Sequence, residues 1–151
     1  MRPDRALVFI MPSAEVVSRQ LTRVEIEHES LRFAVHITRF RREVRAFLDI
    51  CPHFRVPLAV AGQAPMVDLR RSHIICGRHG ARFRMQDGLC VSGPCSGDTL
   101  TSIEAVECLG QLQLFVSRDV LDELRARRSP ACATPGSDAP SLPGPADSRC
   151  E

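Results

Sequence analysis

The sequence predicts an all-β fold built from antiparallel sheets, and three observations lead to this prediction. First, apolar and polar residues alternate along several short runs, most clearly within residues 24–37 and 44–50. Second, turn-forming Gly, Pro, Asp and Ser residues separate these runs, as in other β proteins. Third, helical spacing is confined to one short segment near residue 120. We therefore expect antiparallel sheets or a sandwich, followed by one short helix.

The N-terminal part of the chain predicts a first strand and a hairpin. Residues 6–11 form a short apolar run that suits a strand. Residues 24–28 and 31–37 alternate on either side of a short polar turn, which is typical of an antiparallel hairpin with one face in water. Ala34 and His36 fall on the face that this pattern assigns to solvent.

The middle of the chain consists of short strands and longer loops. Residues 39–45 are expected to form a polar connection, and residues 44–50 a strand that leads directly into Cys51. Residues 54–71 contain Pro and Gly and are expected to form a loop. The dipeptide at 87–88, Asp-Gly, suits the positive φ angles of a tight hairpin turn. Further short strands are predicted at residues 66–69, 73–75, 81–85, 89–91, 103–108 and 111–116.

The C-terminal part predicts a helix and then a disordered tail. Ser117 suits a helix N-cap, and Val120, Leu121 and Leu124 follow at helical spacing. From residue 129 onward the chain is rich in Pro, Ala, Ser and Gly, and it has too few apolar residues to offset the entropy cost of ordering. We therefore divide the chain into one β domain at residues 1–117, a short helix at 118–128 and a disordered tail at 129–151.

The composition of the chain limits the classes of binding partner and the cellular compartment that we expect for it. The chain has 151 residues, a formal charge of +2 and an isoelectric point of about 8.3, a balance too mild to indicate a nucleic-acid partner. There is no apolar run of membrane-spanning length, and no secretory signal is evident at the start. We therefore expect a cytoplasmic protein without a membrane partner. In a reducing cytosol, seven Cys favour metal binding over a disulfide framework.

Two short motifs carry the chemistry of this sequence. Cys51 and His53 form a C-x-H motif, and Cys76 and His79 form a C-x₂-H motif followed by Gly. Each motif comes directly after a predicted strand, so the two loops can meet at their tips. Together they offer two thiolates and two imidazoles, which is enough for a metal centre with four protein ligands.

The residues alone leave three interpretations of these motifs open. A structural zinc site binds four ligands on one atom and more often pairs Cys with Cys. A [2Fe–2S] cluster with two His in place of two Cys on one iron suits the alternation of thiol and imidazole. In the third interpretation the four residues are core Cys and surface His that bind no metal.

The motifs and the residues after them resemble a known family. Residues 51–53 read C-P-H, residues 76–83 read C-G-R-H-G-A-R-F, and residues 87–94 read D-G-L-C-V-S-G-P. These segments are similar to the two cluster-binding boxes and the covering Gly-Pro loop of Rieske-type iron–sulfur proteins. The resemblance covers residues 5–117. It implies a Rieske-like β fold with a two-loop cluster-binding subdomain.

The resemblance also implies a ligand set. Cys51 and Cys76 would bind one iron of a Rieske-type [2Fe–2S] cluster, and His53 and His79 would bind the other. The loop at 93–94 would cover the cluster and help to exclude water.

Several residues depart from the family pattern. Family members usually have Gly two positions after the first His, where this chain has Arg55. The segment between the boxes is longer than usual, and we assign the extra length to residues 59–71, away from the ligands. The second Cys of each box, which forms a disulfide in the cytochrome complexes, is replaced by Val56 and Arg78.

The hydroxyl groups that hydrogen-bond the cluster in those proteins are also missing. Ala81 and Phe83 stand in their positions. Fewer hydrogen bonds to the sulfur atoms stabilise the reduced cluster less, which lowers its potential. The chain therefore resembles the soluble, low-potential Rieske ferredoxins.

These observations predict a one-electron carrier that passes electrons from a reductase to a terminal oxygenase or another oxidoreductase. We do not expect the chain to be an enzyme on its own. A Rieske oxygenase needs a second domain with a 2-His-1-carboxylate iron, and the remaining histidines, His28, His36 and His73, all lie within the predicted β domain. The alternatives are a zinc-stabilised Cys₂His₂ protein-binding module and a Rieske-like small or regulatory subunit of a larger oxidoreductase.

Other notable side chains have simpler interpretations. Cys90, Cys95 and Cys108 are expected to be small core residues, although Cys95 lies in the covering loop and can touch the cluster environment. Four Arg would surround the tip of the two loops, where ordinary solvation and docking to an acidic partner are both possible. They are Arg55, Arg78, Arg82 and Arg84.

Overall fold

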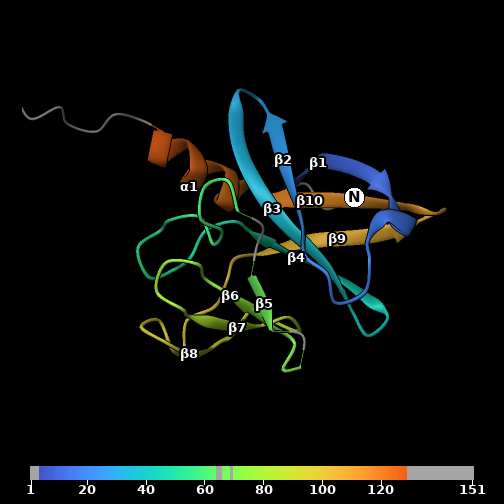
Figure 1. Cartoon of the computed structure of the whole chain (residues 1–151). Coiled ribbons are helices and arrows are strands. Elements are labelled where there is room, and N and C mark those ends of the chain that lie inside the picture. Colours follow the sequence, from blue (N-terminus) through green and yellow to red (C-terminus); the bar gives the residue numbers. More distant parts are fainter. Residues whose placement is uncertain (1–3, 64–65, 69, 129–151) are drawn as a thin grey trace, which may run out of the picture.

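The computed structural model describes residues 4–63, 66–68 and 70–128, which form two antiparallel sheets and one α-helix (Figure 1). The predicted all-β architecture with one short helix is confirmed. The predicted disordered tail at 129–151 lies outside the described residues. The elements are β1 (Arg5–Pro12), η1 (Ser13–Glu15), β2 (Thr22–His28), β3 (Leu31–Phe40), β4 (Glu43–Leu48), β5 (Met66–Asp68), β6 (His73–Ile75), β7 (Arg82–Arg84), β8 (Cys90–Ser92), β9 (Ser102–Cys108), β10 (Gln111–Ser117) and α1 (Arg118–Arg128).

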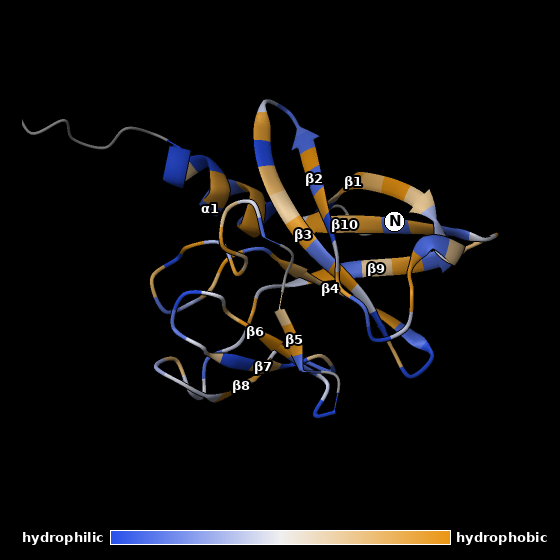
Figure 2. Cartoon of the chain, in the orientation of Figure 1, coloured by the Kyte–Doolittle hydropathy of each residue, from blue (hydrophilic) through white to orange (hydrophobic). Residues whose placement is uncertain are grey.

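The larger sheet has the strand order β1-β10-β9-β4-β3-β2. β4 and β9 share only two residue pairs, and the edge strands β1 and β2 contact each other. The sheet therefore curls over a core to which both halves contribute, and Figure 2 shows hydrophobic and hydrophilic residues alternating along its long strands. Residues from the two halves that meet in this core include Ile26, Val35, Ile37, Leu112 and Leu114.

Two hairpin turns follow the predicted positions. Glu29 and Ser30 join β2 to β3 with φ angles of 46° and 66°. Leu109 and Gly110 join β9 to β10 with φ angles of 50° and 76°. Positive φ at both central residues is the type I′ geometry, which matches the twist of antiparallel strands. The alternating pattern therefore sets the register of these hairpins, even where the turn residues are not the usual Asn and Gly.

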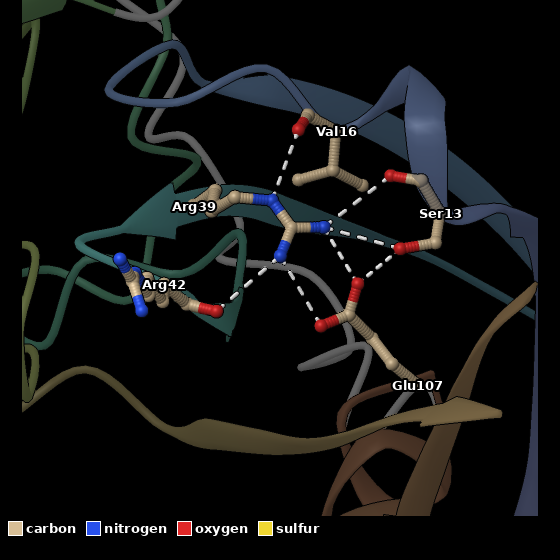
Figure 3. A network of polar contacts seen from close by, with 5 residues as sticks. All are labelled: Ser13, Val16, Arg39, Arg42 and Glu107. Atoms are coloured by element: carbon tan, nitrogen blue, oxygen red, sulfur yellow. Dashed lines mark hydrogen bonds and ion pairs between the residues drawn. The ribbon is translucent and has the colours of Figure 1, made fainter. Parts of the chain in front are cut away.

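The prediction of a polar connection at residues 39–45 is wrong, because the observed connection is much shorter. β3 continues to Phe40 and β4 begins at Glu43, so the connection is a two-residue turn. The polar residue Arg39 belongs to the strand because its guanidinium is held there by several acceptors (Figure 3). It donates to Glu107 of β9 at 2.6 Å and to the Ser13 hydroxyl at 3.1 Å. This cluster of side chains ties β3, β9 and η1 together.

The prediction that one face of the first hairpin is exposed to solvent is also wrong over most of β3. His36 and Thr38 are fully buried, and Ala34 is 9% exposed. His36 is covered by the segment after β4, since its ring bonds to Asp49, which also accepts a hydrogen bond from the Leu58 N–H. Burial of a strand on both faces removes the solvent contact on which the period-2 prediction depends.

The smaller sheet is inserted between β4 and β9 and has the order β5-β6-β7-β8. Each of its strands is three residues long. It has a separate hydrophobic core, which includes Phe47, Leu58, Phe83 and Met85. Figure 1 shows that long loops connect and surround these short strands.

The helix α1 lies against the larger sheet. The Ser117 hydroxyl accepts a hydrogen bond from the Val120 backbone N–H at 3.4 Å, as predicted for an N-cap. Leu121 and Leu124 are buried in the larger core. The helices of the described residues include none that is long and apolar enough to cross a membrane.

Candidate metal centre

The first loop of the site follows β4 and closes on itself through two backbone hydrogen bonds. The Cys51 N–H donates to the Val56 carbonyl at 2.7 Å, and the Arg55 N–H donates to the Cys51 carbonyl at 2.9 Å. Arg55 has a φ of 57°, in the left-handed region that favours glycine. The loop therefore turns sharply between Cys51 and Val56 and carries His53 at its tip.

The second loop repeats this arrangement. The Cys76 N–H donates to the Ala81 carbonyl at 2.9 Å, and the Gly80 N–H donates to the Cys76 carbonyl at 3.0 Å. Gly80 has a φ of 72°. Arg55 thus has the same position in the first loop as Gly80 in the second, so the turn is retained although Gly is missing from the first box.

The two loops are held against each other by backbone contacts. The Gly77 N–H donates to the Leu58 carbonyl at 2.8 Å. A Cβ at Gly77 would lie 3.0 Å from a side-chain carbon of Val60, so only a residue without a side chain fits this contact easily. The segment after the first loop therefore supports the second one. The start of the long inter-box segment lies beside the site and not away from it.

The four residues of the two motifs come together as two pairs. Cys51 and Cys76 are each 1% exposed and lie in the same hydrophobic core. His53 and His79 lie outside them, with their Nδ1 atoms 3.3 Å apart and their rings nearly perpendicular. His79 is exposed and His53 is half-buried. The sulfur pair is thus inside the protein, and the imidazole pair is at the surface.

The two imidazoles lie close enough together to bind one metal atom between them. Two nitrogens bound to one metal at about 2.0–2.1 Å with a tetrahedral angle lie about 3.3 Å apart, which matches the separation of the two Nδ1 atoms. Within the described residues, no three His, Cys, Asp or Glu side chains gather so as to hold a single metal ion. A centre in which sulfur atoms bind one metal and nitrogen atoms the other fits both observations.

The covering loop lies directly on the second box. A Cβ at Gly93 would lie 2.8 Å from the Ala81 Cα, and Gly93 has a φ of 104°. Cys95 is buried in the same loop, with its sulfur 3.4 Å from that of Cys90. Burial raises the pKa of Cys95 to about 12, and the neighbouring Cys90 and Cys51 sulfurs act in the same direction. Cys95 is therefore a neutral thiol at neutral pH.

Burial also raises the pKa of the Cys51 thiol. The His53 backbone N–H donates a hydrogen bond to the Cys51 sulfur, which acts in the opposite direction and lowers this pKa. Metal binding requires the thiolate, so loading of the site releases protons.

Asp49 is a residue that supports the site and that sequence reasoning missed. Its side chain accepts hydrogen bonds from His36 Nε2 at 2.7 Å, Arg23 Nε at 2.8 Å and the Leu58 N–H at 2.8 Å. It thus connects β2, β3 and the segment that supports both loops. Burial acts to raise its pKa, but the hydrogen bonds from His36 and Arg23 outweigh it and lower the pKa to about 2. The only sequence signal was an acid at the end of an apolar strand, immediately before the first box.

The surface around the imidazoles is aromatic and basic. Phe54 is 63% exposed, and its ring centroid lies 4.0 Å from that of His53 and 5.3 Å from that of His79. Three of the four Arg predicted around the tip form ion pairs: Arg55 with Glu123, Arg82 with Asp68 and Arg84 with Asp87. Among the described residues, Arg78 forms none of the ion pairs and is exposed.

The other histidines are not part of the site. His36 is fully buried and bonded to Asp49, and His28 and His73 lie on strands β2 and β6, as predicted for strand residues. The prediction that Cys108 is a core residue is wrong, because its side chain is exposed at the end of β9. Sequence reasoning thus did not identify the residues that support the two loops.

Together, the fold and the site define a small β protein with a two-loop metal centre carried on an inserted subdomain. The model of the Rieske [2Fe-2S] domain family matches residues 6–119 of the sequence. The chain belongs to this family, whose cofactor is a Rieske-type [2Fe–2S] cluster. The buried sulfur pair and the surface imidazole pair fit that cofactor. Comparison of the sequence with curated proteins found no match.

Solved structures agree with the family at the level of the fold. The ferredoxin of carbazole 1,9a-dioxygenase from Nocardioides aromaticivorans IC177 is similar with a TM-score of 0.55 and 16% identity, over 74% of this chain and 96% of that one. The ferredoxin-sized chain in a complex of reduced oxygenase and oxidized ferredoxin of carbazole 1,9a-dioxygenase is similar with a TM-score of 0.56 and 19% identity, over 76% and 93%.

A larger protein contains the same fold as one part. The terminal oxygenase of carbazole 1,9a-dioxygenase from Novosphingobium sp. KA1 is similar with a TM-score of 0.57 and 24% identity, over 77% of this chain. The similarity spans only 30% of the oxygenase chain. The similarity to the ferredoxins, in contrast, extends over nearly their whole length.

Proposed function

We propose that this protein is a one-electron carrier, in which Cys51 and Cys76 bind one iron of the [2Fe–2S] cluster and His53 and His79 bind the other. The observation that carries this proposal is the pairing of the four side chains, with the two thiols buried together and the two Nδ1 atoms 3.3 Å apart. A mononuclear zinc site would need at least three of these groups around one point, and the described residues offer no such group.

Each part of the site has a separate task in electron transfer. When bound, the cluster accepts a single electron and gives it up again. Cys51 and Cys76 hold their end of the centre in the interior, where Phe83 and Met85 exclude water. His53 and His79 extend to the surface, which shortens the path to a partner. No bond chemistry on a substrate is required of any residue.

The partners are inferred from chemistry and from the similar structures. We propose a reductase as the electron donor and a terminal oxygenase or another oxidoreductase as the acceptor, in the cytoplasm. A ferredoxin chain of similar fold is found in complex with an oxygenase. Phe54 offers an exposed apolar contact beside the imidazoles, and Arg78 adds positive charge. An acceptor with an apolar pocket and acidic residues around it would suit this surface.

Metal analysis and a visible spectrum of the purified protein test the ligand assignment. We expect two iron atoms per chain, a brown colour and a paramagnetic signal after reduction. Cys76→Ser should abolish the normal spectrum. Cys108→Ser, which also removes one thiol but at an exposed position on β9, should retain it. A colourless protein with one zinc, or a normal cluster in Cys76→Ser, would contradict the proposal.

Repeated redox cycles test the carrier function separately. We expect the protein to accept one electron from dithionite and to return to its oxidised spectrum on reoxidation, with no loss of iron over several cycles. A cluster that cannot be reduced, or that breaks down on reduction, would be structural and would exclude an electron carrier.

A further inference from the structure

A series of buried hydrogen bonds leads from β3 to the second cluster-binding loop. His36 Nε2 lies 2.7 Å from Oδ1 of Asp49, and the same oxygen accepts a hydrogen bond from the Leu58 N–H at 2.8 Å. The Leu58 carbonyl in turn accepts a hydrogen bond from the Gly77 N–H at 2.8 Å. Gly77 directly follows Cys76, so this series ends beside a proposed cluster ligand.

The proton of the His36 ring is placed by this series. An ionised carboxylate can only accept hydrogen bonds, so Nε2 of His36 carries the proton that is donated to Asp49. Nδ1 of the same ring is buried and has no hydrogen-bond partner within the described part of the chain. Among the polar groups that the structure describes, Asp49 is therefore the partner that orients the imidazole.

The groups in this series are shielded from water. His36 is fully buried, Leu58 is 1% exposed and Asp49 is 6% exposed. Hydrogen bonds are stronger in such an interior, and breaking one of them leaves a buried polar group without a partner. The series therefore resists changes in the relative position of the segments that it joins.

We propose that His36 is a positioning residue of the metal centre, which fixes the second cluster-binding loop relative to the first through Asp49 and Leu58. Asp49 lies two positions before Cys51 in the sequence and reaches the loop of Cys76 through hydrogen bonds. Its backbone N–H also donates to a carbonyl of β3 at 2.9 Å. The orientation of this one carboxylate thus influences the position of both loops.

Three variants separate this role from simple packing. His36→Leu removes the donor and keeps a side chain of similar size, whereas His36→Gln keeps an N–H donor. Thr38→Val is the matched control, because Thr38 is also fully buried and lies two positions further along the same face of β3. Its hydroxyl has no hydrogen-bond partner in the segments that the structure describes.

Hydrogen exchange of the iron-loaded protein, resolved by residue with mass spectrometry, measures the connection directly. In the wild type we expect the Leu58 and Gly77 amides to be protected. In His36→Leu their exchange should become roughly tenfold faster, as expected for the loss of a hydrogen bond to a charged group. The amides of Leu112 and Leu114 in β10 should keep the wild-type rate. Equal loss of protection in all four amides would show a purely structural role and overturn the inference.

The release of iron to a chelator, followed by visible absorbance, is the second readout. We expect release to be roughly tenfold faster in His36→Leu and to keep the wild-type rate in His36→Gln and Thr38→Val. Equal rates in His36→Leu and His36→Gln would overturn the inference, as would an equally fast release in Thr38→Val.

A measurement on the wild type does not depend on whether His36→Leu folds. Protection of the Leu58 and Gly77 amides that is lost in Asp49→Asn but kept in Thr38→Val would support the connection. Amides of Leu58 and Gly77 that exchange at the rate of an unstructured chain would overturn it.

The inference rests on the proposed function, since it takes Cys51 and Cys76 as cluster ligands, but the two fail in different ways. A colourless protein would contradict the proposed function. A coloured protein whose His36 variants exchange amide hydrogens and release iron like the wild type would contradict only the inference about His36.

Discussion

Asp49 is the residue on which the attachment of the metal-binding loops depends most directly. Its carboxylate is buried, yet hydrogen bonds from His36, Arg23 and the Leu58 N–H satisfy it from three directions. A buried charge of this kind is favourable only while its partners remain in place. Asp49 therefore requires the larger sheet and the loop support to keep one relative position.

Replacement of Asp49 tests this requirement. Asp49→Asn keeps the shape of the side chain but removes the charge, and it should lower the free energy of unfolding by about 2–3 kcal/mol. Urea unfolding followed by circular dichroism measures the change. Glu25→Gln is the control, because Glu25 binds the same Arg23 guanidinium but its side chain is 81% exposed. It should cost less than about 0.5 kcal/mol. Equal effects of the two variants would show that the burial of Asp49 is not decisive.

Gly93 shows how a single backbone position can hold the covering loop on the site. It combines a positive φ with a close approach to Ala81, whereas Gly97 has a similar φ of 97° and no atom near its missing Cβ. An alanine at either position has an unfavourable backbone conformation, but only the alanine that replaces Gly93 would also collide with another part of the chain.

We therefore expect different costs for the two glycine variants. Gly97→Ala should destabilise the protein by about 1 kcal/mol, and Gly93→Ala by about 1–3 kcal/mol more. Gly93→Ala should also lose its cluster faster in the presence of a chelator, as followed by visible absorbance. If both variants lose stability and colour equally, the close contact between Gly93 and Ala81 has no role of its own.

At the scale of elements, the Arg39 cluster joins parts of the larger sheet that are far apart in sequence (Figure 3). Arg39 of β3 reaches Glu107 of β9 and the Ser13 hydroxyl of η1, and its Nη1 also donates to the Arg42 carbonyl at 3.4 Å. The hydrogen bond from Arg39 holds the pKa of Glu107 below its ordinary value. The cluster is partly exposed, so its contribution to stability is modest.

The pH dependence of this cluster can be predicted from the direction of the shift. A lowered pKa in the folded state means that the stabilisation is fully present above the ordinary Glu pKa of 4.5 and is lost as the pH falls below it. Glu107→Gln should therefore cost about 0.5–1 kcal/mol at pH 7 and progressively less toward pH 3. Thermal unfolding of both proteins across this pH range measures the difference. A difference that stays constant with pH would contradict the assigned role of the carboxylate.

At the scale of the whole molecule, there are two hydrophobic cores, and only the smaller one contains proposed ligands of the metal centre. The larger core has contributions from β1–β4, β9, β10 and α1, and it contains none of the proposed ligands. The smaller core includes both Cys51 and Cys76, and the strands around it are only three residues long. We therefore expect the larger sheet to be stable by itself and the smaller subdomain to gain part of its order from the metal centre.

Removal of iron should therefore loosen one part of the molecule and not the other. We expect the backbone amides of β6, β7 and the two loops to lose protection from hydrogen exchange, and those of β3 and β10 to keep it. Mass spectrometry of exchange in the iron-loaded and chelator-treated protein measures this. Equal loss of protection in both sheets would mean that the two cores unfold as one unit.

The sequence by itself determined the local elements and the chemical character of the site. Alternation placed β2, β3, β9 and β10 close to their observed bounds, and Ser117 marked the start of α1. The two motifs selected the loops on which His53 and His79 approach each other. Such features depend on backbone preferences and on the spacing of a few side chains, which are local properties.

The tertiary structure alone decided which polar residues are buried and which distant groups become their hydrogen-bond partners. Alternation assigned His36 to solvent, yet the segment after β4 covers it and gives it Asp49 as a partner. The position of Arg39 among acceptors from two other elements has the same origin. These properties depend on the packing of segments that are far apart in sequence, and period-2 patterns carry no information about which segment covers a given face.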